Sequence, residues 1–223
     1  NNGHLGSSAV SNSVMLDAGT LQLTASFTPP ANRKLVVGAG GGTLTGTGGA
    51  GLTAAPEDTL KGAGPLLITG NSATHTLLQT GGSQSNFAGA ITIASGRINL
   101  TSGLATLGSG EITIGGGSAS LYLSSTVALA NVINIQSDGG ETRGAVRLQA
   151  GGTLNGPLVL QSNASIGVEG TATGIINGPI TGAYAFTVGP PNAGNDVSYH
   201  LFASNAQAAT VIRNGILGLT NDY

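Results

Sequence analysis

The chain has 223 residues, of which seven are Lys or Arg and nine are Asp or Glu, so that only 7% of the chain is charged. A formal net charge of −2, with basic residues scattered along the chain, excludes the electrostatic footprint of a nucleic-acid-binding protein. Cysteine is absent, which excludes disulfides and thiolate metal sites, and no apolar run approaches the roughly 20 residues that a membrane-spanning helix needs.

Aliphatic residues recur in pairs that are separated by a single residue along almost the whole chain. Strict alternation predicts strands with one buried face, and Gly, Asn or Ser interrupts these strands too often for ordinary hairpins. A lasting helical stripe of apolar residues is absent. In chain order the predicted strands carry Val14/Leu16, Leu21/Leu23, Leu35/Val37, Leu66/Ile68, Ile91/Ile93, Ile98/Leu100, Ile112/Ile114, Leu121/Leu123, Ile133/Ile135, Val146/Leu148, Leu158/Leu160, Ile166/Val168, Phe186/Val188 and Leu217/Leu219.

Three pairs of segments resemble each other within the chain. Internal repeats in a Gly-rich β sequence indicate a solenoid or a propeller. The offset between Gly96 and Gly215, 119 residues, predicts a long cycle that is incomplete at both ends, so we expect a piece of a longer repetitive chain. The aligned segments are 5–26 with 107–126, 61–70 with 181–189, and 90–102 with 209–221.

These patterns predict an all-β fold, a right-handed parallel β-helix that runs through 1–223 as a single segment. Short strands would stack on those of the next coil, with glycines at the corners and polar ladders outside. With a little over twenty residues per coil, about ten coils would make a rod roughly 50 Å long. Two or three strands per coil fit equally well. A propeller or a sandwich is less favoured, because Trp is absent and Phe and Tyr total only eight.

The segment "NFAGAITIASGRINLTSGLATLGSGEITI" (86–114), preceded by Gly62, Gly64, Leu66 and Ile68, resembles the autotransporter-associated β-strand repeat. This family occurs in passenger regions of bacterial autotransporters and in long Gly-rich bacterial surface proteins. The clear match covers 60–125, and partial matches lie at 5–26 and 181–221. The resemblance implies a right-handed β-helix exported to the cell surface or outside the cell, and it implies no catalytic residues.

Acidic residues form two short clusters. Glu57 and Asp58 follow a proline, and we expect them to remain solvated in a loop. Residues 137–144 have the composition of an exposed turn, in which Glu141 is expected to pair with Arg143. Calcium prefers six to eight oxygen ligands, and this turn offers only two carboxylates plus carbonyls. Neither cluster predicts a catalytic or metal site.

The other candidate sites are weaker still. His4, His75 and His200 are far apart and lack metal-ligand spacing, so we expect surface or loop histidines. The Gly-rich stretch 38–49 lacks the features of a phosphate-binding loop and is interpreted as corners. We therefore predict no catalytic, cofactor-binding or metal-binding residues, and no cofactor.

The aromatic residues allow two interpretations, a structural one and a carbohydrate-binding one. Phe186 and Phe202 are expected in the core, with Tyr184 and Tyr199 at strand edges beside a protruding loop, 189–196. A carbohydrate-stacking stripe would instead require a shared face for Tyr122, Tyr184, Tyr199 and Phe202.

The sequence predicts a non-enzymatic structural module of a secreted or surface-displayed bacterial protein, acting as a stalk, fibre or adhesive scaffold. Self-association end to end or laterally is expected, with surface glycans as a further class of partner. One alternative is a β-helical polysaccharide lyase or hydrolase, which would need two carboxylates beside an Arg or Lys. The other is a glycan-binding adhesin that uses Tyr184 or Tyr199.

Overall fold

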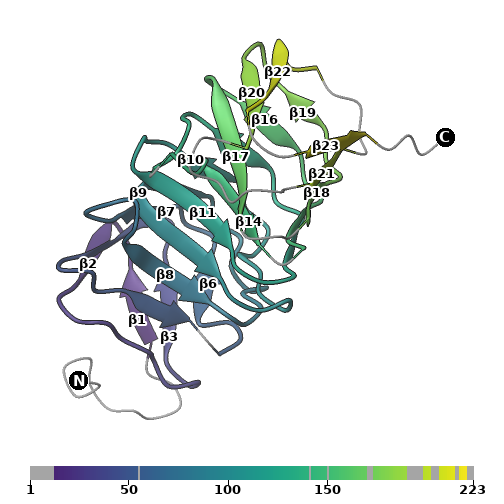
Figure 1. Cartoon of the computed structure of the whole chain (residues 1–223). Helices are drawn as coiled ribbons and strands as arrows, with labels where there is room; N and C mark the ends of the chain where they lie inside the picture. The colour runs from purple at the N-terminus through teal and green to yellow at the C-terminus, as the bar shows by residue number, and fades with distance from the viewer. Residues whose placement is uncertain are drawn as a thin grey trace.

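The computed structural model describes residues 13–54, 56–140, 142–149, 151–169, 173–189, 198–201, 206–213 and 216–219. These residues form a parallel β-solenoid of about eight coils, which confirms the predicted fold class (Figure 1). Strands account for its regular structure, and within these ranges no helix is long and apolar enough to cross a membrane.

Sheet B runs through most of the solenoid, and every neighbouring pair of its strands is parallel. Its inward residues stack in register, and from β7 onwards they form one column of buried Leu and Ile: Leu66, Ile91, Ile112, Ile133, Leu158 and Ile180. The strands are β2 (Gly19–Leu23), β4 (Gly42–Gly46), β7 (Leu66–Thr69), the first part of β9 (Ile91–Leu100), β10 (Ile112–Ile114), β13 (Ile133–Ile135), β16 (Leu158–Leu160) and β19 (Ile180–Thr181).

Sheet C follows sheet B in each coil. The two sheets are joined through β9, whose residues 91–93 pair in sheet B and 96–100 in sheet C. Gly96, at φ +81°, lies where the strand passes from one sheet to the other. The other strands of sheet C are β5 (Leu52–Ala54), β8 (Thr76–Thr80), β11 (Ala119–Leu123), β14 (Val146–Gln149), β17 (Ala164–Glu169), β20 (Ala185–Val188) and β22 (Ala209–Ile212).

A third face precedes sheet B in each coil, so the solenoid has three faces. It consists of two separate sheets, because the coils between them carry only an isolated bridge, Gly62 with Phe87, in place of paired strands. Sheet A contains β1 (Ser13–Leu16), β3 (Lys34–Val37) and β6 (Leu60–Gly62), and sheet D contains β12 (Ala128–Leu129), β15 (Thr153–Leu154), β18 (Thr173–Ile176), β21 (Ser198–Leu201) and β23 (Ile216–Leu219).

The described part of the chain forms about eight coils, against the expected count of about ten. Gly110 and Asn131 are one coil apart and are separated by 21 residues, whereas Gly70 and Ser95, also one coil apart, are separated by 25 residues. Both lengths agree with the predicted little over twenty residues per coil, and corners of different length, such as the long one between β13 and β14, account for the variation. About eight coils at roughly 4.8 Å each give a stack close to 40 Å long.

Outward side chains form the polar ladders that the sequence predicts. In sheet B, Thr20 pairs with Thr43, and Thr92 pairs with Thr113 on the next coil. Gln136 Nε2 donates to Gln161 Oε1 at 2.6 Å, one coil away. Uncharged ladders tolerate this close stacking, because aligned like charges would repel each other.

One corner consists of stacked glycines. A Cβ on Gly64 would lie 1.6 Å from the carbonyl oxygen of Gly38, and one on Gly89 would lie 1.9 Å from that of Gly64. The φ of these glycines is not positive, so the requirement is steric: backbone of the next coil occupies the space of a side chain. The corner column is continued by Gly110, Gly156 and Gly178, where an added Cβ would again lie within about 2 Å of a carbonyl oxygen of the preceding coil.

Asn131 takes the place of a glycine in this corner column, one coil after Gly110. Its Nδ2 donates to the carbonyl oxygens of Gly108 at 3.1 Å and Gly110 at 2.8 Å. The side chain therefore satisfies acceptors of the preceding coil, and it is 7% exposed.

The long cycle that the sequence predicts is not a structural repeat. Segment 90–102 contains β9 on sheets B and C, whereas 209–221 contains β22 on sheet C and β23 on sheet D. The match is thus displaced by one face, and the same holds for 61–70 against 181–189, which run from sheet A to B and from sheet B to C. The matched segments share a pattern of strand, corner and strand. This pattern recurs because the strands of every face alternate inward and outward residues and every face ends in a tight corner.

The interpretation of 38–49 as corners alone is wrong, since β4 lies within it. Leu44 is fully buried, with Thr43 and Thr45 half-buried beside it. Gly42 and Gly46 also belong to β4, and both positions require glycine because a Cβ would lie 2.6 Å from Leu16 Cβ at the first and 2.3 Å from the Ala50 carbonyl oxygen at the second.

Truncation of one inward side chain is expected to weaken the whole stack. Ile112→Ala removes a fully buried side chain that lies between Ile91 and Ile133, and should lower the free energy of unfolding by about 3–4 kcal/mol. Chemical denaturation measures the loss. Thr113→Ala, on the outward side of the same strand, should cost less than about 1 kcal/mol. Equal losses would contradict the assignment of inward and outward faces.

Candidate functional site

The neighbouring acidic residues Glu57 and Asp58 have different surroundings. Glu57 is exposed, as predicted. Asp58 instead accepts hydrogen bonds from the Asn86 amide at 3.0 Å and the Ser85 hydroxyl at 3.1 Å. These bonds, the backbone amide of Asn86 first, hold the pKa of Asp58 below its usual value. Asp58 therefore connects two coils and is more than a solvated loop residue.

The turn 137–144 forms hydrogen bonds with residues of other coils. The carbonyl oxygen of Asp138 accepts from Ser165 Oγ at 2.9 Å, and Ser137 Oγ donates to the Gly116 carbonyl at 2.8 Å. Glu141 lies outside the described residues, so its pairing stays a prediction. Arg143 forms an ion pair with Glu169, whose Oε1 lies 3.0 Å from Arg143 Nη1.

The three histidines give no metal site in the described part of the chain. His75 lies at a corner, as the loop prediction has it, but it is buried and so does not lie at the surface. Its Nε2 lies 2.6 Å from the Ala50 carbonyl oxygen and its Nδ1 lies 3.4 Å from the Asn71 amide, which suits the neutral tautomer with its proton on Nε2. His4 and the side chain of His200 lie outside what is described. Three or more His, Cys, Asp or Glu side chains do not gather anywhere within the described ranges.

The aromatic residues do not share one face. Tyr122 lies on β11 of sheet C, whereas the backbone of Tyr199 lies on β21 of sheet D. Phe186 is fully buried, as predicted, and the exposed Tyr184 directly precedes β20. Phe202 and the predicted protruding loop, apart from Gly189, lie outside the described residues.

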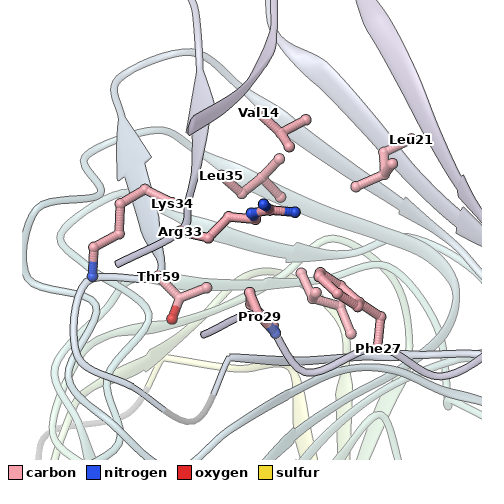
Figure 2. Close-up of a pocket in the computed structure, with 9 residues that line it drawn as sticks. Val14, Leu21, Phe27, Pro29, Arg33, Lys34, Leu35 and Thr59 are labelled. Carbon is pink, nitrogen blue, oxygen red and sulfur yellow. The ribbon is translucent and has the colours of Figure 1, made fainter. Parts of the chain in front are cut away.

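Two hollows stand out in the described part of the solenoid. Figure 2 shows the first, at the N-terminal end, where the guanidinium of Arg33 lies among Val14, Leu21, Phe27 and Leu35. Its volume of about 20 Å³ admits one or two waters and no cofactor. The second is a shallow groove of about 360 Å³ over the corner that contains Gly40, Gly41 and Pro65. Backbone and Thr side chains supply its polar groups, so it offers no charged chemistry.

Charged side chains gather instead on the outer side of sheet C. We define the arginine cluster as Arg97 on β9, Tyr122 on β11, Arg143 in the turn before β14, Arg147 on β14 and Glu169 at the end of β17. Arg97, Tyr122 and Arg147 point outward because they alternate with the buried Ile98, Leu121 and Leu148. The cluster contains three of the seven basic residues in the chain.

Glu169 is the centre of this cluster. Its Oε1 lies 3.0 Å from Arg143 Nη1 and 3.4 Å from Arg147 Nη1, and its Oε2 accepts from the Tyr122 hydroxyl at 3.0 Å. The Tyr122 hydroxyl also contacts Gln149. The guanidinium of Arg97 lies over the Tyr122 ring, 5.5 Å from its centre, as in a cation–π contact.

Burial and mutual repulsion shape the electrostatics of the cluster. Arg147 is 2% exposed, and burial together with the charge of Arg97 lowers the pKa of Arg147 to about 10, which still leaves it protonated at neutral pH. Burial also lowers the pKa of Arg97. The cluster thus holds cations in a partly dehydrated place, where guanidinium is the best suited of the basic groups.

Sequence reasoning missed the arginine cluster because its members lie on successive coils and are therefore far apart in the chain. Arg97 and Tyr122 lie on neighbouring strands of sheet C, and Tyr122 pairs in register with Arg147 of the next coil. Glu169 follows Arg147 by a further 22 residues, which is again one coil. The spacing of one coil, 22 residues, links Arg147 to Glu169, but Arg97 lies two coils before Arg147, so a search at one fixed spacing finds only part of the cluster.

Tyr122 gives the cluster a pH signature. Burial, then the charge of Glu169, raises the pKa of Tyr122 to about 12, against about 10 for an ordinary tyrosine. Folding favours the neutral phenol, so its contribution to stability is complete below about pH 10 and is lost as the pH rises through about 12. Denaturation of the wild type and of Tyr122→Phe should show a steeper loss for the wild type in this window. A pH-independent difference between the two would contradict the assignment.

The fold defines the chain as a parallel β-solenoid protein that carries a charged cluster on one face. No protein-family model matches the chain, and neither a curated protein nor a solved structure matches it.

Proposed function

We propose that the chain is a non-enzymatic structural module of a secreted or surface-displayed bacterial protein, serving as a stalk, fibre or adhesive scaffold. The proposal extends to membership of the autotransporter-associated β-strand repeat proteins, on the resemblance of residues 86–114. The low content of charge and the absence of cysteine are compatible with life outside the cell.

The observation that carries the proposal is the uninterrupted core. Inward aliphatic side chains are buried from Leu16 to Val188, and most of them have no exposed surface. The buried residues form one hydrophobic cluster in the described part of the chain, and the hollow at its N-terminal end admits one or two waters. Such a stack supplies length and stiffness, the properties that a spacer requires.

The ends of the described solenoid support self-association. The partly buried apolar residues that pack against the core lie in its first and last coils: Val14, Leu21 and Phe27 at one end, and Leu217 at the other. A solenoid continues by adding a coil to such an end, whether from the same chain or from a second copy. Sedimentation velocity over a wide concentration range tests this part. Assembly is expected, and a monomer at every concentration would contradict it.

A β-helical lyase or hydrolase would need an acid and a base that act on one saccharide. The arginine cluster brings together three arginines and one described carboxylate, Glu169, whose oxygens are already engaged by Arg143, Arg147 and Tyr122. This arrangement favours a non-catalytic role.

The deciding experiment incubates the purified chain with neutral and acidic polysaccharides and assays new reducing ends and unsaturated products. The proposal predicts none. Products that disappear in Glu169→Gln would overturn it in favour of an enzyme. Antibody labelling of intact producing cells tests the location, with label expected at the surface or in the medium.

A further inference from the structure

The arginine cluster carries more positive than negative charge. Two of its three guanidiniums contact Glu169, and even with Glu141 counted, two residues from Arg143 in sequence, arginines outnumber these carboxylates three to two. Asp138, in the same turn as Arg143, is exposed to solvent. Like charges held close together in a partly dehydrated place repel each other, and an added anion would relieve that repulsion. The lowered pKa of Arg147, caused by burial and then by a second arginine, is consistent with such repulsion.

The cluster is open to solvent on one side. Arg147 is buried at 2% exposure, but the side chain of Arg143 is 44% exposed and that of Glu169 is 19% exposed. Arg97 and Tyr122 are half-buried beside them. A ligand can therefore reach Arg143, Arg97 and the edge of Tyr122 from outside, while Arg147 contributes its charge from beneath.

Polar and aromatic groups beside the arginines suit a ligand that also carries hydroxyls, since Tyr122 and Gln149 are only half-buried. Asn99 pairs in register with Tyr122, and Ser120 pairs with Arg97. Asn99 Oδ1 and Ser120 Oγ are buried and have no hydrogen-bond partner among the described residues, so they make this face more polar but do not contact a ligand that approaches from solvent. The Gln149 amide oxygen lies at the Tyr122 hydroxyl. Guanidinium forks recognise planar oxyanions, and amides, hydroxyls and aromatic rings recognise saccharides.

We propose that the arginine cluster is a binding site for the oxyanion of an acidic saccharide, a carboxylate or sulfate group held by Arg143 and Arg97 over the Tyr122 ring. The site goes beyond a scaffold role and stands without the proposed cell-surface location, because it rests on contacts within the folded chain. An acidic glycan chain that lies on sheet C across its neighbouring strands would contact members of the cluster on successive coils.

Equilibrium binding of the purified chain to four probes tests the site: polygalacturonate, dextran sulfate, neutral dextran and free inorganic sulfate. Binding to the acidic polymers is expected, weakening as salt is raised, with no binding to neutral dextran. Arg143→Gln should weaken that binding about tenfold, since one charged hydrogen bond is lost. The Arg143 side chain is exposed, so this variant is expected to fold. The affinity of Arg143→Lys should lie between those of the wild type and Arg143→Gln, because lysine keeps the charge and loses the planar fork.

Arg213→Gln is the matched control. Arg213 is exposed and directly follows β22, and its loss changes the net charge by the same amount as the loss of Arg143. Equal weakening by both variants would overturn the site in favour of diffuse attraction, and so would the absence of binding to every anionic probe at low salt. Binding of free sulfate that equals polymer binding would keep the oxyanion site and overturn the saccharide as its ligand.

Discussion

Gly89→Ala is expected to destabilise the solenoid by about 3 kcal/mol or more, a large effect for one methyl group. The new Cβ would lie 1.9 Å from the Gly64 carbonyl oxygen and 2.8 Å from the carbonyl carbon. Backbone atoms cannot rotate away as a side chain can, so the two coils must separate and lose their paired strands. Thermal and chemical denaturation should show a lower transition midpoint and free energy of unfolding.

Gly117→Ala is the matched control for this prediction. Gly117 is an exposed corner glycine without a positive φ, and no atom lies within 4 Å of the position that a Cβ would take. The substitution should change stability by less than about 1 kcal/mol, in either direction. A similar loss at Gly89 and Gly117 would mean that chain entropy, and not coil contact, sets the need for glycine.

Glu169→Ala is expected to cost about 3 kcal/mol, because it removes the carboxylate that lies 3.4 Å from the buried Arg147 and one of the two acceptors at the Tyr122 hydroxyl. Denaturation at neutral pH measures the loss. Glu169→Gln should recover part of it, since an amide oxygen can still accept from Tyr122.

Glu57→Ala provides the comparison at an exposed carboxylate, where a change of less than about 0.5 kcal/mol is expected. If Glu169→Ala were as mild as Glu57→Ala, the arginines would be adequately solvated without a counter-charge. The cluster would then be a surface feature with little energetic coupling.

The strands that carry two inward aliphatics could be predicted from sequence, because alternation alone identifies them. Ile91/Ile93, Ile133/Ile135 and Leu158/Leu160 all lie in strands of sheet B. Strands with one inward aliphatic were missed: β4 has only Leu44, and β15 consists of Thr153 and Leu154. A single aliphatic residue gives no alternating pattern in the sequence. Such segments form strands because they pair with the strands of the preceding and following coils.

The coil period was hidden by the repeats that were visible. The visible sequence matches join segments that lie on different faces, and they suggested a long cycle. Matches between segments one coil apart on the same face are short. The clearest is Asn155-Gly156-Pro157 against Asn177-Gly178-Pro179, where Asn177 Nδ2 donates to Asn155 Oδ1 at 2.7 Å. Variable corners change the length of a coil, which is for example 21 residues from Gly110 to Asn131 and 25 residues from Gly70 to Ser95, so no fixed period exists for sequence comparison to detect. The arginine cluster was missed for the same reason.

The central claim, coils stacked in parallel and in register, is tested most directly by engineered disulfides, since the chain has no cysteine of its own. Thr92 and Thr113 are paired directly across one coil, at a separation that suits a disulfide, whereas Thr92 and Asn134 are two coils apart. On mild oxidation the double variant Thr92→Cys with Thr113→Cys should cross-link within one chain, and Thr92→Cys with Asn134→Cys should not. Cross-linking of the second pair but not the first would contradict the stacked solenoid.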